Sequence, residues 1–179
     1  MPKVLNEKQV YPDPSEESPR GVIRVTLRSI EEDDGKRREQ YVWERPEFVV
    51  VIPETPSGKI FAKCEFKYAV MEELLTFAAG AVKKGELPIT AAIRELRQEF
   101  ALSAEGLIPI GEYRVSPDKS TETQHVFVAK NCSPIIGATP EPGTIVIGTP
   151  EEILRKPNMT IALFRAALYD AVAQEALLI

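Results

Sequence analysis

The chain has 179 residues, with 22 basic and 27 acidic side chains and a formal net charge of −5 at pH 7. This length suits one domain with a small appendage, and the acidic balance argues against a general binder of nucleic acid or of anionic membranes. Two widely separated cysteines, Cys64 and Cys132, argue against a cysteine zinc site. A single histidine, His125, excludes a His-rich metal site, so carboxylates are the candidates for chemistry.

The N-terminal residues are charged and lack the apolar segment of a secretion signal. No apolar run reaches the roughly 20 residues that span a bilayer. We therefore expect a cytoplasmic protein with no membrane partner.

The chain divides into three predicted segments. Residues 1–20 are rich in Pro, Glu and Ser, which predicts a flexible leader. Residues 21–46 predict a small N-terminal antiparallel β element, with strands near 22–30 and 39–44. Residues 47–179 predict the main domain, with strands at 48–52, 59–68, 72–77, 111–115 and 125–129. The small residues 78–80 are expected to interrupt this pattern.

Residues 88–102 form the clearest predicted helix, with Pro88 in its first turn. Apolar residues recur at helical spacing and predict the core face: Ile89, Ala92, Ile93, Leu96 and Phe100. Beyond it, we expect a loop region at 133–150 with a short strand at 144–147, a short helix at 149–154 and a C-terminal helix at 159–178. That last helix is expected to serve core or dimer packing.

Two carboxylates lie together on the opposite side of the predicted helix. Glu95 and Glu99 are four residues apart, so their side chains project to one place, with Gln98 beside them. Like charges at this spacing repel weakly on a bare helix, whereas a hard divalent cation would make the arrangement favourable. The alternative is an ordinary solvated face. The helix alone does not decide between the two.

A longer spacing favours the metal site. The sequence has Gly80, five residues, Glu86, seven residues, and then Arg-Glu-Leu-Arg-Gln-Glu-Phe-Ala-Leu. This resembles the signature of the Nudix hydrolases, in which seven constrained positions match: Gly80, Glu86, Arg94, Glu95, Leu96, Glu99 and Leu102. Gln98 stands where the family has Glu, and Ala101 stands where it has Gly.

The resemblance implies a fold and a set of roles. We expect a Nudix-type α/β/α sandwich with a mixed sheet. Glu95 and Glu99, with the backbone carbonyl of Ala79, would bind Mg²⁺, or Mn²⁺ in its place. The amide of Gln98 is a further candidate ligand, because a neutral amide oxygen can accept a metal contact. Glu86 and Arg94 are expected to pair and support the loop, and Gly80 to supply a backbone conformation that other residues avoid. Because Gln98 is neutral, we expect weaker binding of at least one metal. With Ala101 in place of Gly, the helix is expected to continue into residues 102–103.

Flanking residues resemble the ADP-ribose pyrophosphatase branch of that family. The segments 66–69, 79–80 and 116–117 carry this likeness. Pro117 lies about fifteen residues beyond the signature that ends at Leu102. In that branch the general base comes from the following loop, where Glu122 is the only carboxylate within 120–124. Glu122 is therefore a candidate base or extra metal ligand, alongside Glu95 and Glu99 as catalytic carboxylates. The alternative for Glu122 is a charge at a loop tip.

Four residues are candidates for substrate binding: Lys67, Trp43, Tyr41 and Pro117. Lys67 stands where the branch usually has Arg and can neutralise a phosphate, although without a bidentate fork. Trp43 and Tyr41 could stack on the nucleoside, but we favour strand packing for both because aromatic residues are common in strands.

The resemblance implies that a small nucleotide is the substrate. We expect Mg²⁺-dependent hydrolysis of ADP-ribose to AMP and ribose 5-phosphate by a homodimer. The alternatives are another nucleoside diphosphate sugar as the substrate, or a ligand-binding or regulatory Nudix domain with little catalysis.

Overall fold

A computed structural model describes residues 1–12 and 23–178. The chain separates into two units, each with its own internal contacts. The smaller unit combines Met1–Glu47 with Arg114–Thr123, and the larger unit combines Phe48–Tyr113 with Gln124–Ile179. Each unit is described by itself below.

The smaller unit contains one antiparallel sheet in which β2 is the middle strand. Its strands are β1 (Lys3–Tyr11), β2 (Arg24–Glu31) and β3 (Arg37–Glu44). The β2–β3 hairpin agrees with the strands expected at 22–30 and 39–44, within the described residues.

The expectation of a flexible leader over 1–20 is wrong for Lys3–Tyr11, which form β1. Polar residues dominate this strand and nearly all of it is exposed, so composition alone indicated disorder. Pairing with β2 from Lys3–Glu31 to Tyr11–Val25 supplies the backbone hydrogen bonds. The rest of the expected leader, residues 13–20, lies outside the described residues.

The larger unit is built on a mixed four-stranded sheet. Its order is β7 (Ala78–Ala81), β4 (Phe48–Pro53), β10 (Thr123–Lys130) and β9 (Gly106–Arg114). β4 runs parallel to β10 and antiparallel to β7. A second sheet has the order β12 (Thr144–Gly148), β5 (Ile60–Lys67) and β6 (Glu72–Thr76), and β11 (Ser133–Pro134) pairs with β8 (Leu102–Ser103).

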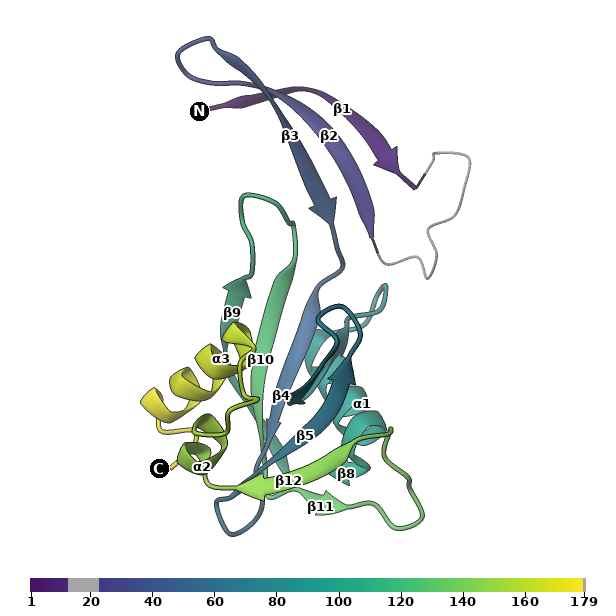
Figure 1. Ribbon diagram of the computed structural model, residues 1–179, viewed down its shortest axis with the longest axis vertical. Helices are drawn as coiled ribbons and strands as arrows, with labels where there is room; N and C mark the ends of the chain where they lie inside the picture. Colours follow the sequence, from purple (N-terminus) through teal and green to yellow (C-terminus); the bar gives the residue numbers. More distant parts are fainter. Residues whose placement is uncertain (13–22, 179) are drawn as a thin grey trace. The chain divides into compact units, whose positions relative to one another are not determined.

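Three helices cover the strands of this unit: α1 (Pro88–Phe100), α2 (Pro150–Leu154) and α3 (Ala162–Ala173). Figure 1 shows α1 on one side of the strands and α2 with α3 on the other side. The expected α/β/α arrangement with a mixed sheet is therefore confirmed. Among the described residues, no helix is both long enough and apolar enough to cross a membrane.

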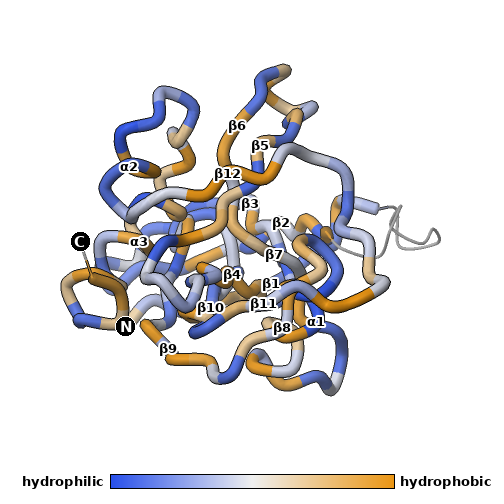
Figure 2. The backbone as a smooth tube through the Cα atoms, turned by 90° about the horizontal axis from the view of Figure 1, so that it is seen from below, coloured by the Kyte–Doolittle hydropathy of each residue, from blue (hydrophilic) through white to orange (hydrophobic). Residues whose placement is uncertain are grey.

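β4 is an apolar strand whose two faces pack in two different clusters of the core, and Figure 2 colours the chain by hydropathy. Val49 and Val51 pack in the cluster that contains the apolar face of α1, whereas Val50 and Ile52 pack in the cluster that contains α3. Successive side chains of a strand point to opposite faces, so a strand covered on both faces needs a continuous apolar run. This requirement explains the unbroken sequence from Phe48 to Ile52.

Helix α1 buries three of the five expected core residues, Ala92, Leu96 and Phe100, but not the two isoleucines. Ala91, Ala92 and Leu96 are buried, whereas Ile89 and Ile93 are 44% and 53% exposed. Small alanines bring the helix close to the sheet, and the turn that carries Glu95 faces inward with them. Apolar periodicity alone therefore wrongly included the two isoleucines in the core face of the helix.

Two further expectations about this region are wrong. The small residues 78–80 do not interrupt the sheet, because they belong to β7 and pair with Val49–Val51 of β4. The helix does not continue into 102–103 either. Ala101 ends it in the left-handed conformation, at φ 53° and ψ 36°, and donates its N–H to the Arg97 carbonyl. Leu102 and Ser103 then form β8.

Tyr113 connects β9 with α3 through its hydroxyl, which donates to the Asp170 carboxylate. Burial, together with this hydrogen bond, raises the pKa of Tyr113 to about 12. A raised pKa means that the stabilisation is fully present below the unfolded value of about 10 and is lost as the pH rises toward 12.

We predict that Tyr113→Phe lowers the free energy of unfolding at pH 8 by about 1 kcal/mol, the usual value of such a hydrogen bond. Urea unfolding measures this loss, which should shrink as the pH rises above 10. Absorbance titration at 295 nm should lose its last-titrating tyrosine, whereas the control Tyr68→Phe, at a residue 82% exposed, should keep it. An unchanged late component in Tyr113→Phe would contradict the assignment.

Candidate metal and phosphate site

The carboxylates of Glu95 and Glu99 lie against neighbouring residues of β7. The Ala79 N–H lies 3.4 Å from Oε1 of Glu99, to which it donates a hydrogen bond. The Glu95 carboxylate lies directly over Gly80. Glu95 is only 9% exposed, so the interpretation of this helix face as an ordinary solvated surface is wrong. The strand and the helix together therefore hold two acidic side chains at one place.

Gly80 is required for space rather than for an unusual backbone conformation. It lies in the extended strand β7 and has no positive φ, which corrects the expectation from the sequence. A Cβ added here would lie 2.1 Å from Oε1 and 2.2 Å from Cδ of Glu95. The absence of a side chain at position 80 is therefore what admits the Glu95 carboxylate against the strand.

Arg94 holds the loop and the helix together. Its Nε and Nη2 atoms each donate to Glu86 at 2.9 Å, and Nη2 also donates to the Ala81 carbonyl at 2.9 Å. Nη1 contacts the Glu95 carboxylate and donates to the Gln98 amide oxygen at 3.2 Å. The expected Glu86–Arg94 pair is present and is bidentate, which fixes the guanidinium plane.

The Glu86 carboxylate is strongly stabilised in its charged form. Its hydrogen bonds with the Arg94 side chain, supplemented by the Lys83 N–H at 2.9 Å, lower the pKa of Glu86 to about 2. Glu86 therefore remains ionised throughout the neutral range. It acts on the loop through Arg94 and contacts Lys83, in agreement with a supporting role.

Gln98 differs from the two carboxylates in its surroundings. Its side chain is exposed, and its amide oxygen accepts from Arg94. That oxygen is one of the candidate metal ligands predicted from the sequence. The interaction with Arg94 shows how a neutral amide is held at this position, whereas the expected weaker metal binding remains a prediction.

Lys63 is a member of this site that sequence reasoning missed. Its side chain on β5 is fully buried, and its ammonium contacts the Glu99 carboxylate and lies 3.5 Å from Glu65. In the sequence, the only sign of its role was a lysine next to Ala62 in a predicted strand that begins near Ile60. The structure shows that both of these neighbours are buried. A charge in that position requires a partner of opposite sign.

Burial raises the pKa of Glu99 above the ordinary value for Glu, and the contact with Lys63 opposes part of this shift. Removal from water disfavours the charged form of a carboxyl group, whereas a neighbouring cation favours it. Glu99 is therefore a carboxylate whose charge depends on a nearby positive group.

The donor set suits one hard divalent cation. Glu95 and Glu99 supply carboxylate oxygens, and Mg²⁺ often takes one or two carboxylates together with water and substrate phosphates. Within residues 1–12 and 23–178, no three His, Cys, Asp or Glu side chains converge as a closed metal cage. The two carboxylates would hold the ion, with the Ala79 carbonyl and the Gln98 amide as the further candidate ligands.

Lys67 lies at the end of β5 and contacts the Glu65 carboxylate. Its side chain is 40% exposed, so the ammonium can reach solvent while it pairs. Glu65 also accepts from the Thr76 hydroxyl at 3.0 Å, and these contacts lower its pKa although burial opposes the change. Lys67 thus joins Lys63 through one shared carboxylate.

Four other predicted site residues belong to the smaller unit. Tyr41 and Trp43 lie on one face of β3 and are 56% and 47% exposed, so the favoured interpretation as packed strand residues is wrong within this unit. Pro117 is exposed in the turn closed by the Ser116 carbonyl, which accepts from Ser120 at 2.7 Å.

Glu122 is 4% exposed and its carboxylate lies 2.9 Å from an Arg45 nitrogen. It is therefore a buried, paired carboxylate rather than an exposed loop-tip charge. Its expected role as base or extra metal ligand remains a prediction.

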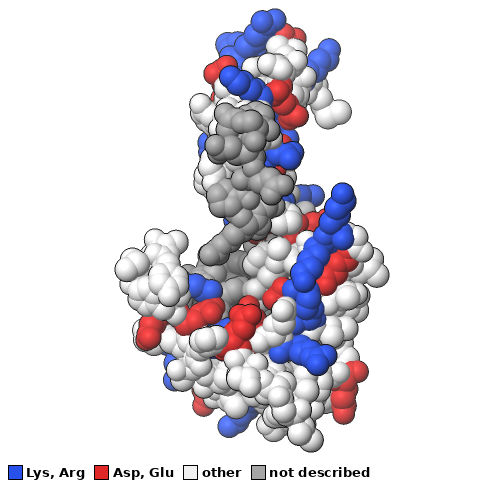
Figure 3. Space-filling view, turned by 90° about the vertical axis from the view of Figure 1, so that its right-hand side faces the viewer, with Lys and Arg blue, Asp and Glu red and all other residues white. Residues whose placement is uncertain are grey.

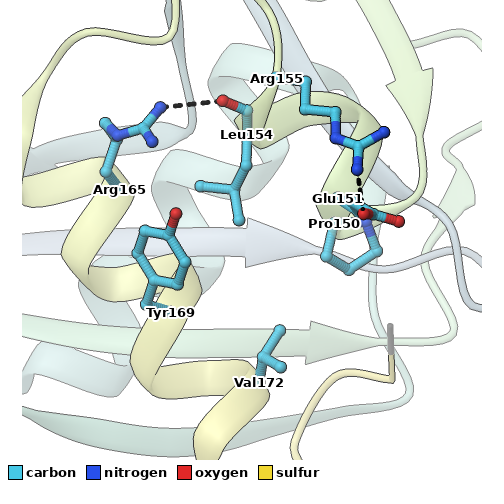
Figure 4. Close-up of a pocket in the computed structure, with 7 residues that line it drawn as sticks. All are labelled: Pro150, Glu151, Leu154, Arg155, Arg165, Tyr169 and Val172. Atoms are coloured by element: carbon cyan, nitrogen blue, oxygen red, sulfur yellow. Dashed lines mark hydrogen bonds and ion pairs between the residues drawn. The ribbon is translucent and has the colours of Figure 1, made fainter.

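Figure 3 shows acidic and basic side chains intermixed over the face that it presents, rather than a broad field of one sign. A hollow of about 340 Å³ lies between α2 and α3 and includes Arg155 and Arg165 (Figure 4). Arg155 pairs with Glu151 at 2.6 Å, and Arg165 donates to the carbonyls of Leu154 and Met159. Both guanidinium groups thus serve the local structure.

The chain is similar to several known proteins. The chain is 31% identical over 112 residues to an ADP-ribose pyrophosphatase of Bacillus subtilis (strain 168), and 27% identical over 112 residues to a methanol dehydrogenase activator of Bacillus methanolicus. Each alignment covers 63% of this chain and 60% of the relative, so the chain spans less than two thirds of either relative's length.

A crystal structure of an ADP compounds hydrolase shares the fold, with a TM-score of 0.81 at 23% identity, over 98% of this chain and 94% of that one. The model of the NUDIX domain family matches residues 43–157, which include the whole signature from Gly80 to Leu102. The chain therefore belongs to the Nudix family.

Proposed function

We propose that this protein hydrolyses the pyrophosphate link of a nucleoside diphosphate derivative, with ADP-ribose as the first candidate and AMP and ribose 5-phosphate as products. The observation that carries this proposal is the pair of carboxylates, Glu95 and Glu99, that α1 holds against β7. Such a pair suits a Mg²⁺ ion that also binds phosphate oxygens. The names of two similar proteins, an ADP-ribose pyrophosphatase and an ADP compounds hydrolase, support the choice of substrate class.

Each residue of the site has a distinct task in this proposal. Glu95 and Glu99 would hold the cation, which would supply charge neutralisation of the diphosphate and activation of a water. Arg94 fixes the position of Glu95 and is itself fixed by Glu86. Lys67, whose ammonium reaches solvent, neutralises a phosphate oxygen.

The smaller unit supplies further candidates. The exposed rings of Tyr41 and Trp43 are available to stack on a nucleoside base. Glu122 is the proposed base, which accepts a proton from the attacking water. In this reaction a bond forms between the water oxygen and one phosphorus, while the bond between that phosphorus and the bridging oxygen breaks. The proposal includes a cytoplasmic homodimer.

A second candidate function is a regulatory or ligand-binding Nudix domain with little catalysis. Two observations favour it: Gln98 replaces a carboxylate and accepts from Arg94, and the charge of Glu99 is already paired with Lys63. The name of one relative, a methanol dehydrogenase activator, is compatible with such a role. Binding of ADP-ribose without release of AMP, together with unchanged binding in Glu99→Gln, would favour this candidate.

The first test is the release of AMP from ADP-ribose with Mg²⁺, followed by chromatography. We predict that Glu99→Gln lowers kcat/KM at least about 100-fold, equivalent to about 2.7 kcal/mol of transition-state stabilisation. The matched control Glu151→Gln changes an exposed carboxylate on α2 and should leave the rate unchanged. Equal rates in the parent and Glu99→Gln would contradict the proposal.

The contact between Gly80 and Glu95 gives a second test. Gly80→Ala should displace the Glu95 carboxylate and weaken Mn²⁺ binding by about 10- to 100-fold, the range seen when groups that position metal ligands are changed. Titration followed by electron paramagnetic resonance measures free Mn²⁺. The control Gly106→Ala adds the same methyl where it meets open space and should bind Mn²⁺ normally. Normal binding by Gly80→Ala would show that Glu95 is not a metal ligand.

Glu122 can be tested as the base by separating its proton transfer from its ion pair. Glu122→Gln should lower kcat by about 100-fold or more with little change in KM, because general-base catalysis contributes at least this factor. Arg45→Met removes the same ion pair but retains the carboxylate, so it should lower kcat much less. Equal losses in the two variants would assign Glu122 a structural role only.

A further inference from the structure

Lys63 lies fully buried beside Glu99, the last carboxylate of the signature helix. Its side chain is 0% exposed, whereas its partner Glu99 is 12% exposed. Besides Glu99 and Glu65, its ammonium lies 5.7 Å from the centre of the Phe100 ring. A lysine that is fully withdrawn from water is costly unless its charge is compensated, and here two carboxylates compensate it.

The surroundings hold this lysine in place. β5 is the middle strand of its sheet, and Lys63 pairs with Thr76 on one side and with Ile145 on the other. Gly143 lies against the lysine stem, where an added Cβ would be 2.7 Å from Cγ and 2.8 Å from Cδ. Because both the backbone and the stem are confined, the ammonium cannot swing far from Glu99.

The charged side chains around Glu95 and Glu99 nearly balance one another without any metal. Four carboxylates are paired there with three cations: Glu65, Glu86, Glu95 and Glu99 with Lys63, Lys67 and Arg94. A divalent ion that binds Glu99 must share that carboxylate with an ammonium of like sign. Repulsion between charges only a few ångströms apart is strong in a partly buried site.

We propose that Lys63 is a resident counter-cation of Glu99, which preserves the carboxylate site in the absence of metal and weakens the binding of a divalent ion there. This inference rests on the proposed use of Glu99 as a metal ligand. It assigns to Lys63 a role in setting metal affinity, separate from the binding of substrate phosphates. Two effects follow: removal of the ammonium should tighten metal binding, and it should destabilise the metal-free protein because Glu99 loses its partner.

The test is a Mn²⁺ titration of the full chain without substrate, followed by the electron paramagnetic resonance signal of free Mn²⁺. Lys63→Met retains the apolar stem and removes the charge. We expect it to bind Mn²⁺ at least about ten-fold more tightly than the parent, because the like charge is gone. The melting temperature of Lys63→Met should fall without metal and rise more steeply with Mn²⁺ than that of the parent.

Two matched controls separate this contact from a general change in charge. Lys67→Met removes the cation that contacts Glu65 but not Glu99, and Lys59→Met removes an exposed lysine just before the same strand. Both should bind Mn²⁺ within about twofold of the parent, since neither ammonium contacts Glu99. If Lys63→Met does not fold, Lys63→Gln is neutral and can still donate to Glu99, and the same tightening is expected of it.

Equal or weaker Mn²⁺ binding by the folded Lys63 variant overturns the proposal, and so does the absence of binding in both variant and parent. Tightening of the same size in Lys67→Met or Lys59→Met also overturns it, because net charge would then be the cause. AMP release from ADP-ribose is assayed separately. Tighter Mn²⁺ binding in a protein that releases no AMP refutes the proposed function alone, whereas AMP release with unchanged affinity refutes the role of Lys63 alone.

Discussion

The site depends on the close approach of α1 to β7, where the Glu95 carboxylate lies over a residue without a side chain. Ala91 and Ala92 permit the approach because their small side chains are buried between the helix and the sheet. Arg94 then joins the helix to the loop that carries Glu86. The acidic pair is thus set by packing, and the ion pairs preserve the placement that packing allows.

Charge compensation is the second theme of the site. A helix turn that brings two carboxylates to one place is unfavourable by itself, and this protein offsets the repulsion with its own cations. Arg94 forms ion pairs with Glu95 and Glu86, and Lys63 forms an ion pair with Glu99. The folded chain therefore retains a formed acidic site, in which the proposed divalent ion would share carboxylates already in position.

The sequence predicted the fold class, most strands and the Glu86–Arg94 pair, because these depend on local periodicity and on motif spacing. It failed where a residue's role depends on a distant partner. Strand β1 is polar and is recognised only through its pairing with β2. Ala101 takes a left-handed conformation that its residue type does not favour. Lys63 looked like an ordinary strand residue, because a sequence does not show that the Glu99 carboxylate of α1 contacts it.

Strand β4 lies between two hydrophobic clusters, and its successive residues belong alternately to one cluster and the other. Val49 contributes to the cluster of α1, and Val50 contributes to the cluster of α3. β10 alternates in the same way, because Val126 and Val128 lie in the cluster of α3 whereas Phe127 and Ala129 lie in the cluster of α1. A change of side-chain volume beneath α3 therefore meets different neighbours from a change beneath α1, and only the latter cluster contains the alanines on which the acidic helix turn rests.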